Sequence, residues 1–212
     1  MSPVKAATLL LPVYVLSDVV GIYLYRKEFS ARNLKILIPA SIVGVLIGWG
    51  TASMLSDRAV ALLIGLMGVG FCLNTWLRRK SDAPPIVPSV AKGWLCGALS
   101  GFTSFVSHAG SPPFQIYVLP QKLPKLVFAG TSTILFAVIN AAKIVPYANL
   151  RPYSVADLKA AATLLPFALV ATVIGAWLTR RIADAWFFRF VQIALFVVSL
   201  KLIADSVPGL AP

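Results

Sequence analysis

Long runs of apolar residues recur along the whole chain and limit its possible folds more than any other feature. Each run spans about 18 to 25 residues, the length a helix needs to cross roughly 30 Å of hydrocarbon. A transmembrane strand would need only about ten residues of alternating polarity. The sequence is 58% hydrophobic and 12% charged, whereas soluble domains carry roughly 25% charged residues. These features exclude a soluble globule and predict an all-α, polytopic integral membrane bundle in a lipid bilayer.

The runs predict about seven hydrophobic spans, one of which is interrupted or re-entrant. The expected spans cover approximately residues 6–25, 36–54, 59–77, 93–119, 126–145, 156–178 and 185–204. The fourth span contains the segment Ser107-His108-Ala109-Gly110-Ser111-Pro112-Pro113. Proline disfavours helix in the residues that precede it, so one continuous helix through this segment is not expected.

Spacings between residues in the two halves indicate an internal repeat. The triplet Pro39, Gly48 and Asp57 recurs 127 positions later as Pro166, Gly175 and Asp184. The segment Val4-Lys5-Ala6-Ala7-Thr8 similarly resembles Val127-Phe128-Ala129-Gly130-Thr131 at an offset of 123. Two copies of one helical unit, an arrangement common in transporters, are therefore expected within a single transmembrane domain over 1–212. Repeat one covers 1–80, the linker 81–92 and repeat two 93–205.

The first copy lacks a counterpart of the interrupted span. Shifting the block at 93–119 back by 123 positions places its partner about 30 residues before Met1, a distance that follows from the repeat. Two explanations stay open. Either the chain has a shortened or misassigned start, or the protein dispenses with one half of a symmetric site.

Most of the basic residues, which bring the formal charge to +12, lie in short connections between the spans. The connection at 26–35 and the connection at 78–92 carry four each, and positively charged loops are typical of cytoplasmic faces. Met1 is then expected outside. A fully crossing block at 93–119 would place Arg180, Arg181 and Arg189 outside as well, whereas a re-entrant block would place them inside and make the repeats inverted. The sequence slightly favours the re-entrant version.

Several other classes of function find no support in the sequence. The basic residues form no stripe with interleaved aromatic residues, so no nucleic acid partner is expected. Cys72 and Cys96 lie inside predicted spans and predict no disulfide, and with a single histidine the chain offers no convincing metal site. No cofactor is expected. Assembly as a homo-oligomer is left open.

The segment from Ser107 to Gln115, followed by Lys125 to Ser132 and by Asn140, resembles the TauE/SafE sulfite exporter family over nearly the whole chain. The resemblance implies a membrane protein with two related halves, located in the bacterial cell (inner) membrane. It implies export of sulfite, sulfoacetate or related sulfur-containing anions. Each half of the family typically carries a glycine-rich segment leading into a proline. Here only the second such segment is present, and Ser111 stands where another glycine is expected.

A break at 107–113 would free backbone N–H groups at the start of a new half-helix, where the N–H groups and the helix dipole stabilise negative charge. A structural kink sealed by neighbouring helices is the alternative. The hydroxyls near the next span could donate to the same anion or bond back to their own helix. The predicted substrate-binding residues are Ser107, His108, Gly110, Ser111, Pro112, Thr131, Ser132 and Asn140.

Asp18 lies deep in the first span, where an ionisable side chain indicates function by default. The repeat offset maps Asp18 to position 141, beside Asn140 and half a turn from Lys143. If the halves pack about a two-fold axis, Asp18 and Lys143 can approach each other. The pair is assigned to coupling or gating, with mutual neutralisation as an equal alternative.

The expected function is therefore export of a small anion by a non-enzymatic membrane transporter. A non-transporting or truncated membrane scaffold is the alternative, because the first glycine-rich segment is absent. An intramembrane hydrolase using Ser100, Ser107 and His108 is a remote alternative. Retained transport after Ser100→Ala would argue against it.

Overall fold

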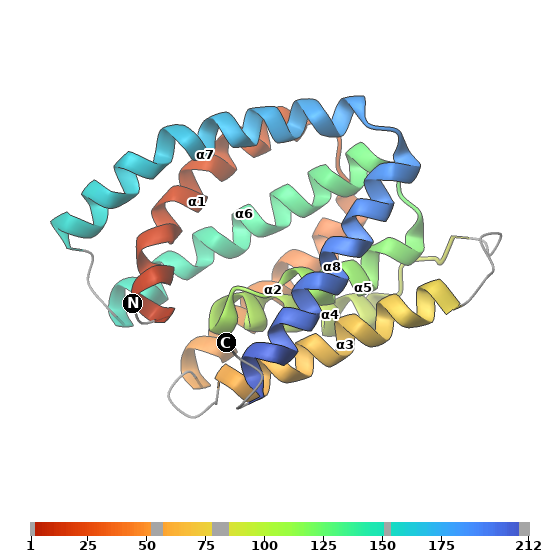
Figure 1. The fold of residues 1–212 in the computed structure, drawn as a ribbon, viewed down its shortest axis with the longest axis horizontal. Coiled ribbons are helices and arrows are strands. Elements are labelled where there is room, and N and C mark those ends of the chain that lie inside the picture. The colour runs from red at the N-terminus through yellow and green to blue at the C-terminus, as the bar shows by residue number, and fades with distance from the viewer. Residues whose placement is uncertain (1–2, 52–56, 78–84, 151–153, 208–212) are drawn as a thin grey trace. The chain divides into compact units, whose positions relative to one another are not determined.

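A computed structural model describes residues 3–51, 57–77, 85–150 and 154–207 (Figure 1). The chain divides into two compact units, which are described separately. Unit 1 comprises Met1–Leu34 and Lys125–Ile182, and unit 2 comprises Lys35–Pro124 and Ala183–Pro212. The helices are α1 Pro3–Tyr25, α2 Ala31–Thr51, α3 Asp57–Leu77, α4 Val90–Ser107, α5 Ser111–Val118, a 3-10 turn Leu119–Gln121, α6 Lys125–Leu150, α7 Val155–Arg181 and α8 Asp184–Ser206.

The prediction of an all-α polytopic membrane bundle is confirmed. Five of the described helices, α2, α3, α6, α7 and α8, are long and apolar enough to cross a membrane, and Leu10–Tyr25 of α1 forms a shorter apolar stretch. Several predicted boundaries were wrong. Helix α2 begins at Ala31 instead of near residue 36. Helix α6 runs through Pro146 to Leu150 instead of ending near Val145. The linker expected to reach Lys92 ends at Ser89, because the Ser89 hydroxyl accepts the Lys92 N–H and starts α4.

Unit 1 is built on a crossing between α1 and α6, which run antiparallel. A Cβ atom on Gly130, near the start of α6, would overlap the carbonyl oxygen of Glu28, just after the end of α1. Farther along, a Cβ on Gly21 would lie 2.7 Å from Thr133. Asn140 contacts Asp18. The contacts therefore move toward the start of α1 as they move toward the end of α6, which makes the two helices antiparallel.

Unit 2 relies on glycine for close helix approach. A Cβ on Gly44 in α2 would overlap the Ala98 carbonyl in α4, and a Cβ on Gly101 would overlap the Ser41 carbonyl. Gly65 and Gly68 of α3 likewise leave room for α8, because a Cβ on either would lie against Ser199. These glycines are packing positions, and small residues at helix contacts are what membrane bundles use in place of a hydrophobic driving force.

The two ends of the interrupted block of unit 2 meet. The N–H of Ile86, before α4, donates to the carbonyl of Pro120, after α5, at 3.1 Å. Near the start of α4, Gly93 lies against the ring of Tyr117 from α5. The block therefore folds as a hairpin whose tip is the break itself.

Candidate functional site

The break between α4 and α5 begins at His108, which adopts a left-handed backbone with φ of 53°. The N–H groups of His108 and Ala109 both bond to the Thr103 carbonyl and close the end of α4. Hydroxyl groups of α4 donate hydrogen bonds to two carbonyl oxygens of the break. The Ser100 hydroxyl donates to the Gly110 oxygen at 2.7 Å, and the Thr103 hydroxyl donates to the Ala109 oxygen at 3.0 Å. The oxygens that would repel an anion are thus engaged by hydroxyls.

Helix α5 begins at Ser111 with few backbone donors. Pro112 and Pro113 follow directly and have no N–H, so the first turn offers the N–H groups of Gly110 and Ser111 only. The Ser111 oxygen accepts a bond from the Gln115 amide at 2.7 Å, which leaves its hydroxyl hydrogen to be donated. The Gln115 carbonyl oxygen is buried and has no partner within the described part of the chain.

The other predicted residues of the break are placed differently. The Ser107 hydroxyl bonds back to the Thr103 carbonyl at 3.3 Å, as the local alternative anticipated. His108 is exposed, whereas Gly110 and Pro112 are buried. An apolar cavity of about 220 Å³ lies beside the break, between Pro113 of α5, Thr103 of α4 and Ile64 of α3. Its apolar lining shields that side of the break from polar ligands.

A second polar cluster lies in unit 1, at the crossing of α1 and α6. The Asn140 amide donates to the Asp18 carboxylate at 2.8 Å. The carboxylate and the Lys143 ammonium also attract each other electrostatically. Lys143 is 1% exposed although it lies in a candidate membrane span. The structure therefore brings together all three residues that the repeat offset had connected.

The remaining predicted hydroxyls are in unit 1 near the start of α6. Thr131 is fully buried; its hydroxyl donates to the Val127 carbonyl at 2.6 Å and accepts the Ser30 N–H at 2.8 Å. Its hydrogen is thus used to hold the connection after α1. Ser132 is half-buried beside it. The predicted substrate contacts of both remain predictions.

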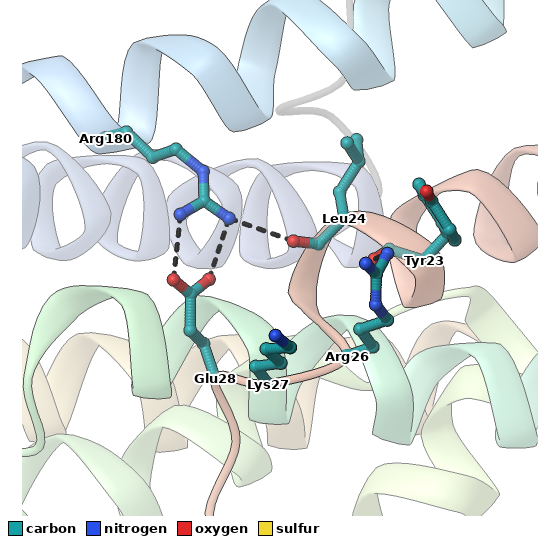
Figure 2. Close-up of a pocket in the computed structure, with 6 residues that line it drawn as sticks. All are labelled: Tyr23, Leu24, Arg26, Lys27, Glu28 and Arg180. Carbon is teal, nitrogen blue, oxygen red and sulfur yellow. Dashed lines mark hydrogen bonds and ion pairs between the residues drawn. The ribbon is translucent and has the colours of Figure 1, made fainter.

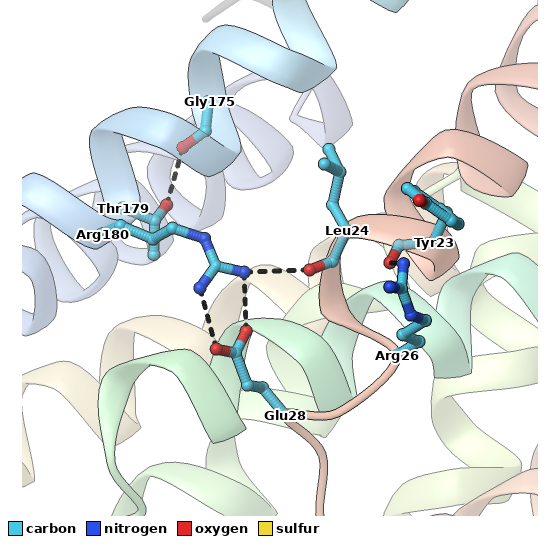
Figure 3. Close-up of polar contacts among 7 residues, drawn as sticks. All are labelled: Tyr23, Leu24, Arg26, Glu28, Gly175, Thr179 and Arg180. Atoms are coloured by element: carbon cyan, nitrogen blue, oxygen red, sulfur yellow. Dashed lines mark hydrogen bonds and ion pairs between the residues drawn. The ribbon is translucent and has the colours of Figure 1, made fainter.

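Unit 1 also contains a charged cleft that sequence reasoning did not single out (Figure 2). Its volume is about 330 Å³. The Arg180 guanidinium makes two bonds of 2.8 Å to the Glu28 carboxylate and a third of 2.9 Å to the Leu24 carbonyl (Figure 3). These bonds place the end of α7 beside the end of α1. The lining consists of Tyr23, Leu24, Arg26, Lys27, Glu28 and Arg180.

Three residues of these sites were not predicted as site residues from the sequence, for different reasons. Glu28 and Arg180 are separated by 152 positions, and no local pattern connects them. Gln115 was visible, since it ends the glycine-rich segment one helical turn after Ser111. An amide one turn after a hydroxyl on an interrupted helix could have been recognised as its neighbour.

The contacts of Ser100 bear on the hydrolase alternative. Its hydroxyl donates to the Gly110 carbonyl, and a carbonyl cannot remove a proton as the base of a nucleophilic serine must. The bond instead seals the break.

Comparison with known proteins gives one match. The family described as "Sulfite exporter TauE/SafE" matches residues 1–202. Neither the curated proteins nor the solved structures include a match to the chain. The family match covers both polar sites and all the described helices except the last residues of α8. This chain belongs to the sulfite exporter TauE/SafE family.

Proposed function

We propose that this protein exports a small anion across the bacterial cell (inner) membrane, with sulfite or a related sulfur-containing anion or organosulfonate as its substrate. Membership of the sulfite exporter TauE/SafE family supports export of such an anion. The single structural observation that carries the proposal is the re-entrant break, because it is irregular backbone inside an apolar bundle. Backbone of this kind is tolerated at membrane depth only where protein buries it or where it lines a polar path.

The polarity of the break favours an anion over a cation. Hydroxyls from α4 cover the carbonyl oxygens of Ala109 and Gly110. What remains for a ligand is the N–H groups of Gly110 and Ser111, the Ser111 hydroxyl and the positive end of the α5 dipole. Two N–H groups and a hydroxyl suit the oxygens of a small oxyanion. His108, exposed at the tip, is proposed to contact the anion as it enters or leaves.

The other predicted residues have distinct proposed roles. Pro112 fixes the first turn of α5, and Ser107 closes the last turn of α4. Thr131 holds the connection after α1, while Ser132 and Asn140 offer polar groups to the substrate from unit 1. Asp18 and Lys143 are proposed to gate or couple transport.

Export requires no coupling ion in this scheme. Moving one charge across 100 mV is worth about 2.3 kcal/mol, so a divalent anion gains about 4.6 kcal/mol on leaving an inside-negative cell. The membrane potential alone is then sufficient to drive efflux.

The proposal is tested with purified protein in liposomes, by measuring flux of sulfite, sulfate, thiosulfate and a small organosulfonate. We expect selective flux that Ser111→Leu abolishes, because the larger side chain fills the space above the N–H groups. Ser111→Gly should retain flux, since it keeps the backbone donor. Thr163→Leu introduces the same side chain at an exposed position of α7 and serves as the control. Wild-type flux through folded Ser111→Leu would refute the break as the substrate site.

A further inference from the structure

The cluster of Asp18, Asn140 and Lys143 holds a positive charge that the stability of the fold does not require. Lys143 is 1% exposed, and a buried ammonium is costly inside a membrane unless it is paired. Asp18 lies beside it, because Asn140, one helical turn before Lys143 on α6, bonds to the Asp18 carboxylate. Replacing a buried ion pair by apolar residues of similar size is often neutral or stabilising, so packing alone does not account for it.

The position of the cluster indicates binding. Transporter sites for substrates and coupling ions lie where inverted repeats meet, near the middle of the bilayer. Asp18 and Asn140 touch where α1 and α6 cross, and these helices are the equivalent members of the two repeats. The groups on α7 that pack against the same part of α1 are uncharged: Leu158, Ala161, Ala162, Leu165 and Thr172. Among the described side chains named at this crossing, Lys143 carries the positive charge.

We propose that Lys143 binds the transported anion and that Asp18 is its competitor within the chain. This inference rests on the proposed anion transport and adds the residue that recognises charge in unit 1. In the empty state the Asp18 carboxylate neutralises Lys143, and Asn140 holds that carboxylate by its amide bond. An arriving oxyanion takes the place of Asp18 at the ammonium. Asn140 keeps the displaced carboxylate hydrogen-bonded, and the return of Asp18 to Lys143 releases the anion.

If Asp18 and the anion compete for Lys143, substitution of Lys143 and substitution of Asp18 should change the anion affinity in opposite directions. Lys143→Gln removes the binding charge, and we expect anion affinity to fall at least tenfold. Asp18→Asn removes the competitor, and we expect affinity to rise severalfold while release slows. Lys143→Arg keeps the charge and should restore most of the affinity. A pair that serves only to neutralise itself would leave the affinity unchanged in every folded variant.

The experiment measures sulfite and sulfate affinity of the purified full chain by the shift in thermal unfolding, together with flux in liposomes. Folding is controlled by the double variant Asp18→Asn/Lys143→Gln, which carries no unpaired charge and should unfold at the wild-type temperature without anion while binding at least tenfold more weakly. Lys201 and Asp205, an exposed pair 4.0 Å apart on α8, provide matched controls as Lys201→Gln and Asp205→Asn. Neither should change affinity.

The outcomes separate the two proposals. Wild-type flux with unchanged affinity in Lys143→Gln and in the folded double variant overturns the role of Lys143 but leaves anion transport standing. Reduced affinity in both Lys143→Gln and Asp18→Asn overturns the competition. Absence of any anion effect on the wild-type protein overturns this inference together with the proposed function.

Discussion

The guanidinium of Arg180 holds the carboxylate of Glu28 by two hydrogen bonds of 2.8 Å (Figure 3). This contact places the carboxyl end of α7 at the same end of unit 1 as the carboxyl end of α1. Lys125, at the start of α6, donates to the Ile182 carbonyl and places the start of α6 there too. Within unit 1, α1 and α7 therefore end where α6 begins, so α1 and α7 run parallel to each other and antiparallel to α6.

Cysteine labelling in intact cells should detect this arrangement. We expect Arg26→Cys and Arg181→Cys to react from the cytoplasmic side, and Lys159→Cys, near the other end of α7, to react from outside. The background is Cys72→Ala/Cys96→Ala, which removes two buried thiols. If Arg26→Cys and Arg181→Cys reacted from opposite sides, the inverted arrangement would be wrong.

The re-entrant path makes a separate labelling prediction in unit 2. Val87 and Lys122 are exposed residues near the two ends of the hairpin that Ile86 and Pro120 close. Val87→Cys and Lys122→Cys should therefore be modified by the same impermeant reagent from the same side. Labelling from both sides of the membrane would mean that the block crosses the bilayer.

Glycine substitutions should separate close contacts from open positions. A Cβ on Gly101 would overlap the Ser41 carbonyl, whereas a Cβ on Gly175 has nothing within 4 Å. We expect Gly101→Ala to lower the free energy of unfolding by about 1 to 3 kcal/mol, as overpacking does. Gly175→Ala should raise it by up to about 1 kcal/mol, because alanine favours helix. Thermal unfolding in detergent measures both, and equal effects would argue against the α2 and α4 contact.

The hydroxyls that seal the break should matter for stability. Thr103→Val leaves the Ala109 carbonyl without its hydroxyl donor, and we expect a loss of about 1 to 3 kcal/mol in the free energy of unfolding. Thr163→Val removes a hydroxyl that bonds locally on an exposed face and should cost little. If the two variants unfolded at the same temperature, the break would not depend on Thr103.

Ser100→Ala tests the hydrolase alternative. The substitution removes the donor to the Gly110 carbonyl, so we expect lower stability but retained flux in folded protein. Thr163→Val again provides the control. Loss of flux from Ser100→Ala protein that is as stable as the wild type would count against a purely sealing role.

The repeat was the most productive signal in the sequence. The offset maps Asp18 to position 141, beside Asn140, and predicted that Asp18 and Lys143 can approach each other if the halves pack about a two-fold axis. In the structure, the Asn140 amide bonds to the Asp18 carboxylate. The apolar runs predicted the helices for the simple reason that hydrocarbon requires internally bonded backbone. Pro146 misled the prediction of the end of α6, since neighbouring helices can satisfy a proline in a membrane helix.

The candidate site was less predictable because hydrogen bonds decide which groups stay available. From the sequence alone, the hydroxyls of Ser107, Ser111 and Thr131 are equally good candidates for binding a ligand. In the structure, Ser107 and Thr131 donate to carbonyls of their own helices, whereas Ser111 accepts from Gln115 and keeps its hydrogen. Such differences depend on rotamers and neighbours that spacing does not encode.

The most direct test of anion export is the dependence of sulfite efflux on membrane potential. Proteoliposomes loaded with sulfite are held at a series of inside-negative potentials set by a potassium gradient and valinomycin. We predict efflux above that of protein-free liposomes that accelerates as the interior becomes more negative, since the potential drives the anion out. Efflux equal to that of protein-free liposomes at every potential, from protein shown to be folded, would contradict the account.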